Sequence, residues 1–134
     1  MQGTAQIEGN SAFAFRALLA MMPAFQSGET MMALQLRPNC EYCDKDLPPA
    51  STEARICSYE CTFCADCVET KLFNVCPNCG GGFVPRPIRP AQQWRNGVCV
   101  QSHPPSDKRV QLKYSRDDVA THVARIRDVP PEQR

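Results

Sequence analysis

The spacing of the cysteines constrains this chain more than any other feature. Eight of its nine cysteines lie between positions 40 and 79, with the spacing C-x2-C-x13-C-x3-C-x2-C-x2-C-x8-C-x2-C. Two thiolates separated by two residues can bind one metal ion across a tight turn, and tetrahedral Zn²⁺ takes four such ligands. Eight ligands therefore predict two zinc ions. The predicted metal ligands are Cys40, Cys43, Cys57, Cys61, Cys64, Cys67, Cys76 and Cys79.

The order of these pairs resembles the RING finger, in which two ligand pairs adjoin in the middle of the domain. The segment 57–67 (CSYECTFCADC) is similar to the central RING box, with Cys61 where a histidine is usual, and CPNC at 76–79 is similar to its closing pair. The resemblance implies cross-braced ions, although sequential pairing of the cysteines stays open. One ion would be held by Cys40, Cys43, Cys64 and Cys67, and the other by Cys57, Cys61, Cys76 and Cys79.

A second resemblance rests on the motifs RPNCEYCDKDLPP, ICSYECTFCADCVE and VCPNCGGGFVPRPIRP. Together they resemble a family of small bacterial cysteine-rich proteins that is catalogued as a domain of unknown function (number 1272). The likeness runs from Leu34 to about Pro90. It implies a zinc-binding, RING-like module, and it supplies no substrate.

Size makes metal the expected source of stability. A module of about sixty residues buries too little apolar surface to be stable on that basis alone. We therefore expect a small metal-stabilised α+β fold, a RING-like cross-brace zinc domain with little regular secondary structure, plus a short C-terminal helix. Residues 1–31 are interpreted as an N-terminal extension, disordered or helical and upstream of the true start, 32–90 as the two-zinc module, 91–114 as a linker and 115–134 as the C-terminal helix and tail.

Local patterns predict several elements within this scheme. The alternation Leu34-Gln35-Leu36 predicts a short strand, and apolar residues at near-helical spacing predict a helix over 65–73. Residues 85–90 (PRPIRP) predict an extended linker. Ser115 is expected to cap a C-terminal helix with one apolar face and arginines opposite. That apolar face consists of Val119, His122, Val123 and Ile126.

Cysteine usage also indicates the compartment. Cysteines in x2 pairs favour metal over a disulfide framework, and the ninth, Cys99, is expected to be a spare thiol. Thiols that bind zinc imply a reducing environment, so the expected localisation is cytoplasmic. The apolar stretch 12–25 contains Arg16 and Pro23, which makes it too short and too charged for a membrane span.

The charge distribution argues against nucleic acid as a partner. Residues 32–90 carry six basic and seven acidic side chains, whereas residues 91–134 carry eight and five. Two Zn²⁺ ions with eight thiolates would bring the module to a net charge of about −5. Phosphate backbones bind to clustered Lys and Arg, which this module lacks.

We accordingly expect a non-catalytic zinc-binding module that mediates protein–protein interaction. The sequence contains no nucleophile–base set, and Gly80–Gly82 follow a cysteine pair instead of a strand, so they do not form a phosphate loop. A ubiquitin-ligase-like RING is the first alternative, because Tyr42 and Pro77 fit the E2-binding rim, although Gly80 stands where ligases usually carry a basic residue. A nucleic-acid-binding zinc ribbon and a thiol redox or zinc sensor are the others.

Overall fold

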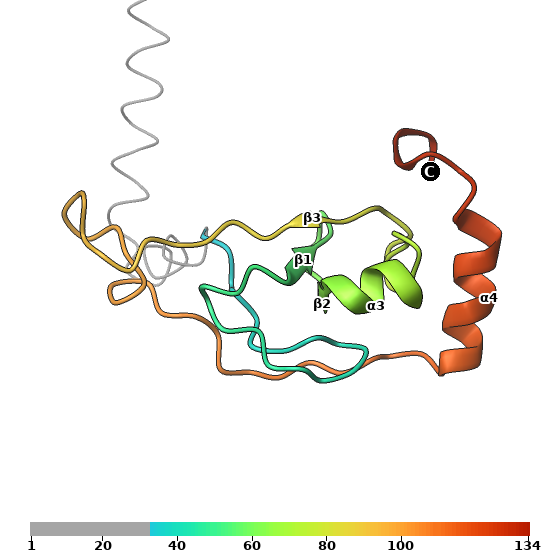
Figure 1. Ribbon diagram of the computed structural model, residues 1–134, viewed down its shortest axis with the longest axis horizontal. Helices are drawn as coiled ribbons and strands as arrows, with labels where there is room; N and C mark the ends of the chain where they lie inside the picture. The colour runs from blue at the N-terminus through green and yellow to red at the C-terminus, as the bar shows by residue number, and fades with distance from the viewer. Residues whose placement is uncertain (1–32) are drawn as a thin grey trace, which may run out of the picture. The chain divides into compact units, whose positions relative to one another are not determined.

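The computed structural model describes residues 33–134, of which 35–134 form one compact unit. Residues 1–31, which the sequence analysis interpreted as an N-terminal extension, lie outside the described residues. The elements are β1 (Ala54–Ile56), β2 (Thr62–Cys64), α3 (Ala65–Thr70), β3 (Val84–Pro85), α4 (Arg116–Ile126) and a 3-10 helix at Pro131–Gln133 (Figure 1). A short three-stranded sheet, few helices and two groups of cysteine sulfurs confirm the expected small α+β class.

The sheet has the order β2-β1-β3, with both neighbours antiparallel to β1. Ile56 pairs with Thr62 on one side and with Val84 on the other. These strands contain the β-branched and aromatic residues that suit a pleated, half-buried surface. Phe63 in β2 is completely buried and packs edge-on against Phe83, with ring centroids 5.3 Å apart. This contact positions the sheet beside the cysteines.

The predicted strand over 34–36 was wrong. No strand is assigned there, and Leu36 has a φ of 55°, in the left-handed region that a strand excludes. Its side chain is nevertheless buried, at 2% exposure. The alternation of leucines therefore reflected one buried position and not a paired strand.

α3 follows directly from β2, and a metal-ligand candidate caps it. The Sγ atom of Cys64 accepts a hydrogen bond from the Cys67 backbone N–H. The helix buries Cys67 and Val68 and ends at Thr70, three residues before the predicted end. It ends early because Phe73 and Asn74 both have positive φ, at 47° and 63°. Leu72, just beyond the helix, is fully buried.

Two tight turns with the same hydrogen-bond pattern hold the first and last cysteine pairs. We name them the first knuckle (40–45) and the closing knuckle (76–81). In the first knuckle, Cys40 N–H donates to Lys45 O and Asp44 N–H donates to Cys40 O. In the closing knuckle, Cys76 N–H donates to Gly81 O and Gly80 N–H donates to Cys76 O. The residue after the second cysteine has positive φ in each, 66° at Asp44 and 81° at Gly80. Asp and Gly tolerate this conformation, which explains their place in the sequence.

The segment 106–113 runs alongside the first knuckle before it reaches α4 (Figure 1). The Asn39 side chain pairs with the Val110 backbone in both directions, at 2.8 and 3.1 Å. Arg109 forms ion pairs with Asp44 and Asp46 at 2.9 and 2.8 Å. This segment, which we call the strap, thus ties the C-terminal region to the cysteine-rich core.

Arg86 fixes the exit from the sheet. It is 4% exposed, and its guanidinium donates to the backbone carbonyls of Arg37, Leu47 and Pro48 at 2.8–3.1 Å. Burial lowers the pKa of Arg86 from its ordinary value. Three carbonyl acceptors compensate for the lost hydration of this charge. The segment after β3 is therefore anchored to the loop that joins the first two cysteine pairs.

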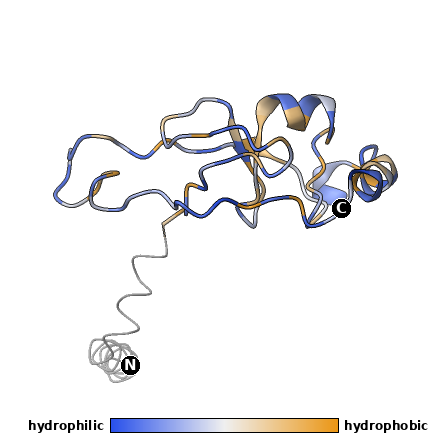
Figure 2. Ribbon diagram, turned by 90° about the horizontal axis from the view of Figure 1, so that it is seen from below, coloured by the Kyte–Doolittle hydropathy of each residue, from blue (hydrophilic) through white to orange (hydrophobic). Residues whose placement is uncertain are grey.

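α4 has the predicted cap and the predicted apolar face. The Ser115 hydroxyl accepts a hydrogen bond from Asp118 N–H at 3.1 Å, and Asp117 and Asp118 lie in the first turn. Val119 and Val123 are buried, at 2% and 3% exposure. Figure 2 shows hydrophobic and hydrophilic residues together on this helix. α4 thus contributes its valines to the same core as Leu47, Phe63, Leu72 and Val75.

None of the helices between residues 33 and 134 has the length and apolar character that a bilayer span requires.

Candidate metal centre

The first cluster brings together two cysteine pairs that are separated in the sequence. The Sγ atoms of Cys40, Cys43, Cys64 and Cys67 all lie within 4.8 Å of one another. Those of Cys43 and Cys64 are 3.8 Å apart. In a tetrahedral site, Zn–S bonds of about 2.3 Å place the sulfurs about 3.8 Å apart. The first cluster therefore has the size that a zinc ion requires.

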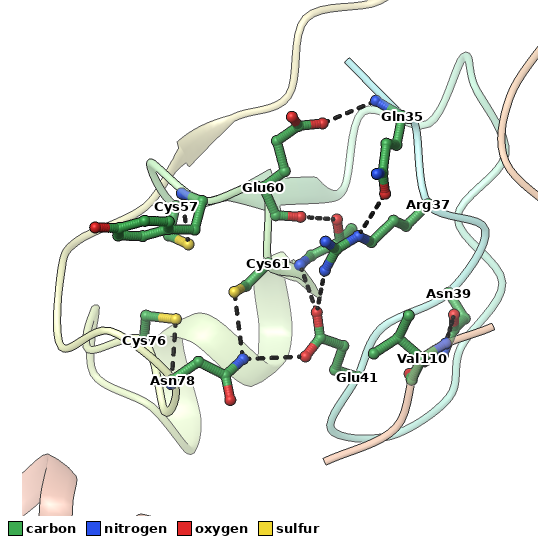
Figure 3. Close-up of polar contacts among 12 residues, drawn as sticks. Gln35, Arg37, Asn39, Glu41, Cys57, Glu60, Cys61, Cys76, Asn78 and Val110 are labelled. Carbon is green, nitrogen blue, oxygen red and sulfur yellow. Dashed lines mark hydrogen bonds and ion pairs between the residues drawn. The ribbon is translucent and has the colours of Figure 1, made fainter. Parts of the chain in front are cut away.

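The second cluster contains three sulfurs, with a fourth beside it. The Sγ atoms of Cys57, Cys76 and Cys79 lie within 4.8 Å of one another. Cys61, the predicted fourth ligand, is not a member of this group. Its Sγ atom accepts a hydrogen bond from Asn78 Nδ2 at 3.2 Å (Figure 3). The cysteines are thus grouped as a cross-brace implies, with first and third pairs together and the second beside the fourth, rather than sequentially.

Backbone N–H groups donate to each of the three sulfurs of the second cluster, as the Cys67 N–H does to Cys64 in the first. In three places, the N–H two residues after a cysteine donates to its Sγ, at 3.3–3.4 Å. The donors are Tyr59, Asn78 and Gly81. Such bonds stabilise a thiolate over a thiol. The turns that position the cysteines also prepare them to bind a cation.

The sulfurs of each cluster shift one another's pKa values. Burial raises the pKa of Cys40 to about 11, and burial together with the nearby Cys40 raises that of Cys67. Hydrogen bonds with Cys61 and Cys76 lower the pKa of Cys57 to about 3, while the bond to Cys57 raises that of Cys76. Raised pKa values oppose the thiolate form at Cys40, Cys67 and Cys76. A divalent cation at the centre would oppose this effect, because thiolates bound to a metal are deprotonated.

Glu41, in the first knuckle, reaches Asn78, which lies beside Cys61 and Cys76 (Figure 3). Its side chain is 1% exposed and forms an ion pair with Arg37 at 3.1 Å. The carboxylate also accepts hydrogen bonds from Thr62 N–H at 3.1 Å and from Asn78 Nδ2 at 3.3 Å. Burial raises the pKa of Glu41, and the bond from Thr62 opposes that rise. Glu41 stands between Cys40 and Cys43, so one carboxylate links three ligand-bearing loops.

Asn78 is the partner of Glu41 in the closing knuckle. Its Nδ2 atom faces two acceptors, the Glu41 carboxylate and the Cys61 sulfur. This fixes the orientation of the amide, since the opposite orientation would place an oxygen against both acceptors. The Oδ1 atom is then buried without a hydrogen-bond partner. The sequence analysis did not assign these hydrogen-bonding roles to Glu41 and Asn78, although each is a polar residue between two paired cysteines, which was a usable signal.

Among the described residues, one further cysteine and two histidines, Cys99, His103 and His122, are members of neither cluster. Cys99 is buried at 3% exposure, and its Sγ donates to the Ser102 hydroxyl at 3.6 Å. Neither Cys99 nor His103 belongs to the sulfur groups found among the described residues. His122 on α4 contacts the closing knuckle through Nε2, which lies 3.0 Å from Cys76 O. It therefore packs against a ligand loop without being a member of the cluster.

α4 covers the positions that a RING-like rim would present. The guanidinium of Arg116 lies over the Tyr42 ring, 4.6 Å from its centroid. Pro77 is buried and lines one cavity with Val119 and His122. A Cβ atom on Gly80 would meet the Ile126 side chain at 3.5 Å. The apolar side of the rim is thus occupied by the chain's own helix.

Comparison with known proteins places the cysteine-rich region in a family. The model for "Protein of unknown function (DUF1272)" matches residues 33–89. An uncharacterized protein of Rhizobium meliloti (strain 1021) is 57% identical over 77 residues, which are 58% of this chain and 84% of the relative. The chain belongs to the DUF1272 family. No solved structure matches it significantly. Both cysteine clusters lie inside the residues that the DUF1272 model matches, and α4 lies beyond them.

Proposed function

We propose that this DUF1272 protein is a non-catalytic module in which two Zn²⁺ ions organise a surface for binding another protein. The observation that carries the proposal is the first cluster, where four sulfurs lie within 4.8 Å of one another and two are 3.8 Å apart. All-sulfur, tetrahedral sites of this size favour zinc over harder cations. Cys61 would complete the second site by turning its sulfur from Asn78 toward the ion.

A structural role follows from the number of ligands. A catalytic zinc keeps one position for water or substrate, whereas four thiolates close the coordination sphere. The metal therefore contributes folding free energy, of the order of 10 kcal/mol per structural site at neutral pH. A fold with three short strands and two helices needs that contribution. What remains for function is the protein surface that the ions hold in place.

The arrangement of α4 favours this function over ligase activity. An E2 enzyme would need the surface around Tyr42 and Pro77, and α4 lies against both positions. Gly80 offers no basic side chain, and Ile126 lies beside it. We therefore propose protein binding without transfer of ubiquitin.

Metal content per chain, measured with a count of free thiols, tests the proposal. Protein purified without added metal should contain two zinc ions and one free thiol, that of the buried Cys99. Cys64→Ser should lose zinc and unfold, whereas Cys99→Ser should keep two ions and lose that free thiol. Loss of zinc from Cys99→Ser would refute the ligand assignment. A metal-free protein without free thiols would refute the proposed function as a whole.

A partner should then be captured only by the zinc-loaded form. Photo-crosslinking from an exposed position such as Tyr59, which is 72% exposed, should yield adducts with native protein. The same experiment on Cys64→Ser is the matched control, and equal adducts from both would show that the zinc fold is not what the partner recognises.

A further inference from the structure

α4 is held on the module by a small set of contacts. Its apolar contribution comes from Val119 and Val123, with Ile126 only partly buried. The His122 ring bonds to one backbone carbonyl of the closing knuckle. Two arginines lie over aromatic rings, Arg116 over Tyr42 at 4.6 Å and Arg127 over Phe73 at 3.8 Å. None of these contacts includes a cysteine side chain.

The fit of α4 to this surface is incomplete. A cavity of about 360 Å³ lies between the helix and the closing knuckle, and it is lined by Pro77, Asn78 and α4 side chains that include His122 and Arg125. A second cavity of about 400 Å³ lies beside Ile126, Val129 and Gly80. Both cavities are open to solvent, so the polar residues of α4 border surface clefts and the buried contact of the helix is confined to its apolar side.

The rest of the module has a different source of stability. Its loops are held by the two knuckle turns, the Glu41 network and the buried Arg86, and α4 supplies none of the grouped cysteine sulfurs. Local opening begins in elements with few buried apolar contacts and exposed hydrogen bonds. α4 buries only Val119 and Val123 of its own residues, and its detachment would remove no predicted zinc ligand.

We propose that the surface beneath α4 is a helix-docking groove, and that α4 is an internal occupant that a partner helix displaces. This inference rests on the proposed function and names the binding surface. Docking of an amphipathic helix in a groove uses apolar anchors at i, i+4 and i+7. Val119, Val123 and Ile126 have that spacing.

α4 itself specifies the chemistry of the partner. The anchors are small and aliphatic, as the valines are, and arginines near both ends of the helix lie over Tyr42 and Phe73. With two ions bound, the module would carry a net charge of about −5, which would attract the flanking arginines of a partner helix. α4 itself is neutral, because Asp117 and Asp118 balance Arg116 and Arg125. The partner is therefore a protein that presents an amphipathic helix with a valine or isoleucine stripe and flanking arginines.

A release variant of the full-length protein tests this. Val119→Asp combined with Val123→Asp places two charges on the buried face and should detach α4. Ala120→Asp combined with Ala124→Asp is the matched control, because both alanines are exposed on the same helix. The probe is a fluorescein-labelled peptide of residues 112–129, measured by fluorescence anisotropy. Zinc content is measured on every variant.

We expect the release variant to keep two zinc ions and to bind the peptide at least tenfold more tightly than the wild-type and control proteins. A peptide carrying the same two aspartates should not bind. If the release variant keeps its zinc but binds no better, the groove is not a helix-docking site, and the zinc module stands. If it loses zinc, α4 is an integral part of the metal-stabilised core, and the inference is overturned. A wild-type protein without zinc would instead refute the proposed function.

Discussion

Removal of the Glu41 carboxylate should weaken zinc binding at both clusters. In Glu41→Ala, the buried Thr62 N–H loses its acceptor, which costs about 1–3 kcal/mol. Breaking a buried ion pair by removing one partner costs about 3–5 kcal/mol. Arg37 is 21% exposed, so water replaces part of that interaction. We therefore expect a loss of about 2–4 kcal/mol of folding free energy.

Because folding and metal binding are coupled in such modules, this loss appears in the zinc affinity. A loss of 2–4 kcal/mol corresponds to a roughly 30-fold to 1,000-fold weaker overall zinc affinity. Competition with a chromophoric chelator at neutral pH measures it. Glu41→Gln retains an acceptor oxygen for Thr62 N–H, so its zinc affinity should lie between those of Glu41→Ala and the wild type.

Glu53→Ala is the matched control for Glu41. It also removes a carboxylate from an ion pair, with Lys45, but both side chains are 49% exposed and neither links two ligand loops. Zinc affinity should stay within about threefold of the wild type, as exposed pairs contribute little. If Glu41→Ala behaves like Glu53→Ala, the argument that one buried carboxylate joins the two sites is refuted.

Three further predictions concern other parts of the chain. Cys61→Ser should keep one tightly bound zinc ion, at the first cluster, and hold the second at least tenfold more weakly; loss of both ions by metal analysis would contradict this. Arg86→Met should destabilise the zinc-loaded protein by about 2–4 kcal/mol, because three carbonyls lose a charged donor, and an unchanged denaturation midpoint would refute that role. Ser115→Ala should cost about 1 kcal/mol of helix stability, seen as faster hydrogen exchange in α4 with unchanged exchange in α3.

The sequence was informative wherever a residue's role depends on its near neighbours. Pairs of cysteines two residues apart predicted the knuckles, and the Ser115 cap with an apolar stripe predicted α4 closely. The first cluster has the composition that the resemblance to RING fingers implied. In each case, the physical cause is a turn or a helical repeat, which acts over a few residues.

Roles that depend on distant residues were not predictable in this way. Glu41 and Arg86 are charged, and charged side chains are rarely buried, so only the folded chain shows the partners that allow it. The strap was interpreted as part of a linker, because its pairing with Asn39 joins residues 71 positions apart. The strand expected over 34–36 failed because alternation over three residues fits a single buried leucine equally well.

The strap has a consequence for any partner of the groove. Val110 is paired to Asn39, and only four residues separate it from Ser115, which caps α4. A detached α4 therefore remains close to its groove, at an effective concentration of the order of millimolar. A competing helix present at micromolar concentration must bind about a thousandfold more tightly than α4 does in order to replace it. The short tether would thus set a minimum affinity for a partner helix, and a helix that binds the groove more weakly would not displace α4.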